Sequence, residues 1–116
     1  MDIAPSARHS GLIRPARVED VEDMQALINT YAAEDRMLER SRDFLLEHLR
    51  DFVVARNGSH FLGCCALAVL TPDLAEVRSL AVSREASGRG IGRALVEACI
   101  AEARRLGTRR VFALTL

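Results

Sequence analysis

The 116-residue chain has few cysteines, no long apolar run and no excess of either charge. Its three cysteines cannot pair off evenly, and none is spaced from His9, His48 or His60 as zinc ligands are, so the sequence predicts three small buried thiols and no metal site. No segment reaches the ~18 to 20 apolar residues that a membrane span requires. The formal net charge of zero argues against a nucleic-acid partner.

The length predicts one domain, because 116 residues have room for a single hydrophobic core. The start of the chain, residues 1–6, lacks the basic region and the apolar core of a signal peptide, so the expected location is the cytoplasm. Residues 1–11 are polar and aperiodic, and we interpret them as a flexible N-terminal tail. Residues 12–116 are then the folded domain.

Apolar periodicity and turn residues predict a mixed sheet flanked by helices, an α/β fold. Ser41 is expected to cap the second helix and Gly107 to end the third, while Glu19 and Asp20 are placed in the first turn of the first helix. Asn57-Gly58 indicates a hairpin slightly wider than the tightest two-residue type. The expected elements are a strand at 12–16, a helix from 21 to 31, a helix after 41, strands at 52–56, 61–70 and 75–82, a helix that follows the glycine turn and ends before Gly107, and a strand at 111–116.

The most informative pattern is a strand that runs into a glycine-rich turn before a helix. Gly88, Gly90 and Gly92 carry no Cβ, so successive N–H groups can approach one anion, to which the helix dipole adds partial positive charge. A P-loop is excluded because Arg93 follows where Lys-Ser or Lys-Thr is needed, and a dinucleotide fingerprint because Arg93 fills its sixth position. Two interpretations of the turn remain. It is either a pyrophosphate-binding turn of another type, flanked by Arg89 and Arg93, or an ordinary surface turn.

Six dispersed segments, residues 13–16, 38–42, 49–52, 62–67, 76–82 and 111–115, stand in the order that is typical of the GNAT superfamily of acyltransferases. The chain resembles this superfamily and, more narrowly, the acetyltransferase domain of the N-acetylglutamate synthases of arginine biosynthesis. The resemblance implies a GNAT-type mixed sheet. Two departures are evident. Ser87 stands where the family's glycine motif usually begins with Arg or Gln, and the sequence stops after the fifth strand, where these enzymes continue with a helix and two strands, so we expect a truncated domain.

The resemblance implies acetyl-CoA as the co-substrate, with no metal. Backbone amides of the glycine turn would hold its pyrophosphate, and main-chain groups of the preceding strand would pair with its pantetheine arm as an added strand. The arm would lie between that strand and the strand at 111–116. The residues concerned are Leu80, Ala81 and Val82 for the arm, and Gly88, Arg89, Gly90, Ile91, Gly92, Arg93 and Ala94 for the pyrophosphate.

Glu76 matches the position at which several GNAT enzymes carry a general base. An amine must lose a proton before it attacks a thioester, and a nearby carboxylate can accept that proton. The alternative is that Glu76 is a solvent-facing strand residue; Arg78 could pair with it. Tyr31, the only tyrosine, shares helical spacing with Val21 and Ile28, so we interpret it as core packing rather than as a catalytic acid.

Arg40 and Arg42 are the candidate partners of an acidic acceptor, because a planar guanidinium matches a carboxylate with two hydrogen bonds. Either one is alternatively a surface charge. The predicted function is transfer of acetyl from acetyl-CoA to the α-amino group of L-glutamate or a close analogue. The alternatives are a GNAT enzyme for another small amine or a protein amine, and a non-catalytic acyl-CoA-binding module, which Ser87 and the missing C-terminal part favour. The sequence leaves open whether the protein forms a homodimer.

Overall fold

The computed structural model of the protein describes residue 9 and residues 11–114. Within them the elements follow the order that the sequence predicts: one strand, two α-helices, three strands, a third α-helix and a last strand. Short 3-10 turns cover Val18–Asp20, Leu49–Asp51 and Arg84–Ala86. The strands are β1 (Ile13–Pro15), β2 (Phe52–Asn57), β3 (His60–Thr71), β4 (Leu74–Val82) and β5 (Arg110–Ala113), and the helices are α1 (Val21–Ala32), α2 (Arg42–Glu47) and α3 (Ile91–Leu106).

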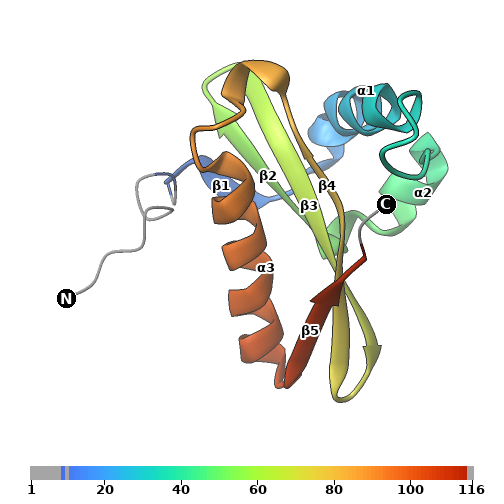
Figure 1. Cartoon of the computed structure of the whole chain (residues 1–116), viewed down its shortest axis with the longest axis vertical. Helices are drawn as coiled ribbons and strands as arrows, with labels where there is room; N and C mark the ends of the chain where they lie inside the picture. The colour runs from blue at the N-terminus through green and yellow to red at the C-terminus, as the bar shows by residue number, and fades with distance from the viewer. Residues whose placement is uncertain (1–8, 10, 115–116) are drawn as a thin grey trace.

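The strands form one mixed sheet in the order β1-β2-β3-β4-β5. The first four are antiparallel neighbours, whereas β5 pairs parallel to β4 after the chain has crossed over through α3. Figure 1 shows α3 on one side of the sheet and α1 and α2 on the other. This arrangement is the predicted GNAT-type sheet, in which β5 pairs with the first half of β4 and the start of α3 lies near the other end of β4.

The sheet has an apolar core on each face. One core joins α3 to side chains such as Ala55 and Cys65, and the other joins α1 and α2 to Val54 and Cys64. Adjacent residues contribute to opposite cores because successive side chains of a strand alternate between faces. All three cysteines are buried, as predicted, and burial raises the pKa of the Cys64 thiol to about 12.

Three details differ from the sequence prediction. The β2–β3 hairpin is tighter than expected, because Asn57 pairs with His60 across a two-residue turn that begins with Gly58 at φ +62°. Asp20 lies in the 3-10 turn before α1 and is fully buried, not in the first turn of that helix. The last strand begins at Arg110 and ends at Ala113, while residues 115 and 116 of the predicted strand lie outside the described residues.

Both predicted helix caps are confirmed. The Ser41 hydroxyl accepts a hydrogen bond from the Phe44 N–H at 3.0 Å, which starts α2. Gly107 adopts φ +87° after α3, and the Thr108 N–H then donates to the Ala103 carbonyl at 2.9 Å.

Candidate active site

The glycine turn leaves three backbone N–H groups at the start of α3 without a partner among the described residues. Gly88 and Gly90 adopt φ +78° and +84°, a region that residues with a Cβ rarely occupy. The first helical hydrogen bond runs from the Ala94 N–H to the Gly90 carbonyl at 3.0 Å, so the N–H groups of residues 91–93 have no partner within the helix. Together with the helix dipole they form a site suited to an anion.

The side chains of the two arginines near the glycine turn differ in how freely they could contact an anion. The Arg93 guanidinium pairs with Glu97 one helical turn later, at 2.8 Å, so its charge is partly engaged. The Arg89 side chain is exposed, while its carbonyl lies 2.6 Å from His9 Nε2. A Cβ on Gly92 would lie 3.4 Å from the Val82 side chain, which shows how closely the start of α3 approaches the end of β4.

β4 contains a bulge that the sequence did not reveal. Cys64 pairs with Ala81 and Ala66 with Arg78, so two residues of β4, Ser79 and Leu80, face the single residue Cys65 of β3. Ser79 adopts φ +56°, which is uncommon for a residue with a side chain. The bulge increases the local twist of β4 midway along the strand.

The outer edge of β4 is open beyond this point. Pairing with β5 ends at Val77, so in the part of the chain that the structure describes no strand covers the edge of residues 78–82. The Ser83 N–H donates to the Leu62 carbonyl, which makes those two residues the hydrogen-bonded pair of the ladder. The neighbouring Val82 therefore directs its N–H and carbonyl away from β3, toward the open edge.

Tyr31 binds to one of these outward groups. Its hydroxyl donates to the Val82 carbonyl at 2.5 Å, and its ring packs on the core beneath α1. The prediction of a packing role is therefore incomplete, because the hydroxyl also fixes the end of β4. The Val82 N–H remains directed at the open edge.

Glu76 and Arg78 form an ion pair on β4, at 2.6 Å between Arg78 Nη2 and Glu76 Oε1. The Glu76 side chain is only 13% exposed, so it is not the solvent-facing residue of the alternative interpretation. Residues 76 and 78 lie on the same face of the strand because side chains alternate. A carboxylate and a guanidinium thus stand together just before the bulge.

Arg40 lies close to this pair. Burial and the positive charge of Arg78 lower the pKa of the Arg40 guanidinium, and the charge of Glu76 opposes the shift. The guanidinium stacks over the Phe44 ring at 4.3 Å. Its Nε is buried and has no hydrogen-bond partner among the described residues. A buried charged donor without a partner is costly and is suited to an anionic ligand.

Arg42, the second predicted acceptor residue, is placed differently. It is the first residue of α2, its side chain is exposed, and no hydrogen bond or ion pair joins it to the described residues. The structure therefore brings Arg40, Glu76 and Arg78 together and leaves Arg42 outside this cluster.

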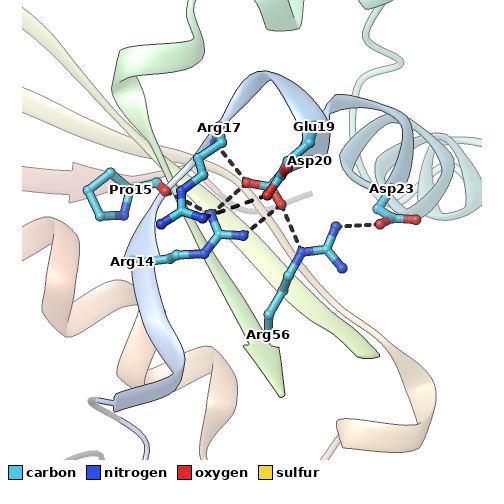
Figure 2. Close-up of polar contacts among 7 residues, drawn as sticks. All are labelled: Arg14, Pro15, Arg17, Glu19, Asp20, Asp23 and Arg56. Carbon is cyan, nitrogen blue, oxygen red and sulfur yellow. Dashed lines mark hydrogen bonds and ion pairs between the residues drawn. The ribbon is translucent and has the colours of Figure 1, made fainter. Parts of the chain in front are cut away.

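A buried ion-pair network around Asp20 was missed by the sequence reasoning (Figure 2). The carboxylate accepts hydrogen bonds from Arg14 at 2.8 and 3.0 Å, from Arg56 Nε at 2.8 Å and from the Arg17 N–H at 2.7 Å. Arg56 also pairs with Asp23. The network joins β1 and β2 to the start of α1, at the other edge of the sheet from the open edge of β4. Since its charges are matched, we assign it a structural role.

Two further kinds of feature are absent from the described part of the chain. Among residues 9 and 11–114, no three or more His, Cys, Asp or Glu side chains are grouped so that they could hold a metal ion. No helix in the same residues has the length and apolarity needed to cross a membrane.

Comparison with known proteins identifies the family of the chain. A model described as the acetyltransferase (GNAT) family matches residues 18–116. An uncharacterized N-acetyltransferase of Chlorobaculum tepidum is 45% identical over 90% of this chain and 67% of its own length, and an amino-acid acetyltransferase of Mycobacterium tuberculosis is 39% identical over 90% and 61%. The N-acetylglutamate synthase of Neisseria gonorrhoeae, complexed with coenzyme A and N-acetyl-glutamate, superposes with a TM-score of 0.86 at 35% identity, covering 89% of this chain and 24% of the synthase. The chain thus spans only part of the proteins that it matches.

Proposed function

We propose that this chain, which belongs to the GNAT acetyltransferase family, transfers an acetyl group from acetyl-CoA to the α-amino group of an amino acid. The observation that carries the proposal is the buried Nε of Arg40, which has no hydrogen-bond partner among the described residues and lies beside the Glu76–Arg78 pair, where the open edge of β4 begins. We further propose L-glutamate as the acceptor, as in the N-acetylglutamate synthases of arginine biosynthesis that the chain resembles. The names of relatives at 35 to 39% identity support an amino-acid acceptor.

The coenzyme would bind at the two places where backbone groups are unpaired. The N–H groups at residues 91–93, with the glycine turn before them, suit the pyrophosphate, and the open edge of β4 at residues 80–82 suits the pantetheine arm. Because the Val82 carbonyl already accepts from Tyr31, the N–H of Val82 is the group that we assign to the arm. Acetyl-CoA supplies an activated thioester; the residues of this chain orient it and handle the proton.

Glu76 would accept the proton that the acceptor amine loses, directly or through a water. Its largely buried position beside Arg78 keeps the carboxylate in one orientation, because the guanidinium donates to Oε1 at 2.6 Å. The second carboxylate oxygen is then left to face the amine. Arg78 acts through Glu76 and is a positioning residue in this scheme.

The charge of the cluster indicates what the acceptor must carry. Arg40 and Arg78 contribute two positive charges and Glu76 one negative charge, so one carboxylate of an amino acid would neutralise the cluster. Arg40 is the group that we assign to this carboxylate. A second carboxylate, as in glutamate, needs a second cation, and exposed Arg42 remains our candidate for it.

Replacing Arg40 with alanine tests the acceptor assignment. An unpaired carboxylate in the pocket is expected to lower kcat/KM for glutamate by ~30- to 150-fold, while the Kd for CoA stays unchanged. Glutamine and leucine lose less if Arg40 holds the side-chain carboxylate, whereas all three fall together if it holds the α-carboxylate. Arg50→Ala, at an exposed arginine after α2, is the matched control. Equal kinetics of Arg40→Ala and the parent protein on all three amino acids would show that Arg40 does not bind the acceptor.

A further inference from the structure

The end of α1 contacts both sides of the proposed reaction centre. On the acceptor side, the Asn29 side chain makes two hydrogen bonds to the backbone of Arg40: the Arg40 N–H donates to Oδ1 at 3.0 Å, and Nδ2 donates to the Arg40 carbonyl at 3.2 Å. Arg40 lies in the irregular segment between α1 and α2, where no helix or strand provides backbone partners. Asn29 therefore fixes the position from which the Arg40 side chain projects.

On the coenzyme side, Tyr31 reaches β4 two residues further along the same helix. Its hydroxyl binds the outward-facing Val82 carbonyl, and Arg84, just beyond β4, forms an ion pair with Glu34 beyond α1. The guanidinium groups of Arg36 and Arg84 also lie 5.3 and 5.5 Å from the centroid of the Tyr31 ring. These contacts join the end of α1 to the segment that leads into the glycine turn.

We propose that Asn29 and Tyr31 are positioning residues that set the distance between the acceptor carboxylate and the coenzyme thioester. The inference rests on the proposed function. One helical segment binds Arg40 through Asn29 and the open edge of β4 through Tyr31. Because the backbone of a helix is hydrogen-bonded throughout, the distance between these two contacts is nearly fixed. Transfer needs the amine and the thioester carbon to meet within ~3 to 3.5 Å, so small errors in this distance reduce the rate.

The two residues are expected to affect different substrates. Asn29→Ala removes both contacts to Arg40 and should raise KM for the amino acid by ~10-fold with KM for acetyl-CoA unchanged. Asn29→Asp keeps the acceptor for the Arg40 N–H and loses the donor, so its KM should lie between those of the alanine variant and the parent. Tyr31→Phe removes only the hydroxyl and should raise KM for acetyl-CoA by ~5- to 10-fold with little change for the amino acid.

Thr30→Ala is the matched control, because Thr30 lies between the two residues and its hydroxyl donates only to the Ala26 carbonyl of the same helix, at 2.7 Å. Steady-state kinetics with each substrate varied, and the Tm of each variant, decide the outcome. A split in which Asn29 variants affect the amino acid and Tyr31→Phe affects acetyl-CoA supports the inference.

Two results would overturn it. If either variant changes both KM values equally in step with a lower Tm, the residue is merely structural. If Asn29→Ala leaves amino-acid kinetics unchanged while Arg40→Ala impairs them, Asn29 does not position Arg40 and the proposed function still stands. If Arg40→Ala is also without effect, the acceptor site itself is misassigned.

Discussion

Replacing Asp20 with asparagine should be the most destabilising polar change in the described part of the chain. The Asp20 side chain is 0% exposed, and those of its partners Arg14 and Arg56 are only 24% and 17% exposed. Removing the carboxylate charge leaves Arg14 without an ion-pair partner and Arg56 with only the half-exposed Asp23. Breaking a buried ion pair in this way costs about 3 to 5 kcal/mol in comparable cases. The start of α1 would lose its anchor, so Asn29 and Tyr31 at its far end would shift as well.

The same network predicts an acid dependence of stability. Burial alone would raise the pKa of Asp20, but the hydrogen bonds from Arg14 and Arg56 outweigh it and lower the pKa to about 2. Because this is below the unfolded value of 3.8, the ion pairs contribute fully above about pH 4 and the contribution is lost as the pH falls toward 2. The loss should be about 2 kcal/mol and absent from Asp20→Asn.

Urea unfolding at pH 7 and at a series of lower pH values measures both effects. Glu19→Gln is the control, since the Glu19 side chain is 69% exposed, and it should change the free energy of unfolding by less than about 0.5 kcal/mol. The reasoning is refuted if Asp20→Asn unfolds within that margin of the parent protein at pH 7, or if it loses stability on acidification as steeply as the parent.

Two further predictions concern the coenzyme and the proton. Gly90→Val places a β-branched residue at φ +84° in the anion site, so calorimetry should detect no CoA binding, whereas binding as tight as that of the parent protein would refute the assignment of the pyrophosphate to this turn. Glu76→Gln keeps the shape of the side chain and removes the base, so kcat should fall by ~100-fold or more with CoA affinity unchanged; a pH profile of kcat identical to that of the parent would show that another group takes the proton.

Local signals in the sequence were sufficient to predict the order of the helices and strands, whereas the GNAT-type sheet was implied by the resemblance. Apolar periodicity and capping residues such as Ser41 and Gly107 act within a few residues, so the element order and both caps could be read directly. The glycine turn was equally local. The sequence analysis predicted the β2–β3 hairpin to be too wide because it made both strands too short at the turn. In the structure the pairing extends to Asn57 and His60, so only two residues are left in the turn.

The features that could not be predicted depend on contacts between distant residues. The partners of Asp20 lie 6 and 36 residues away from it, and nothing in the spacing of arginines selects Arg14 and Arg56. The bulge at Ser79 could not be predicted because the position with positive φ is occupied by serine, not by glycine. Arg40 and Glu76 were singled out by resemblance, but only the fold brings Arg40 next to the Glu76–Arg78 pair.

The most direct test of the account is release of free thiol from acetyl-CoA by the purified protein, measured with a panel of amino acids and amines, with mass spectrometry of the product. We predict thiol release that depends on an amino acid, greatest with L-glutamate, together with a product whose α-amino group carries the acetyl group. Release with polyamines or peptide amines and with no amino acid in the panel would contradict the proposed acceptor. CoA binding without thiol release for any acceptor would contradict the proposal that the protein is an enzyme. It would favour the alternative of a non-catalytic coenzyme-binding module.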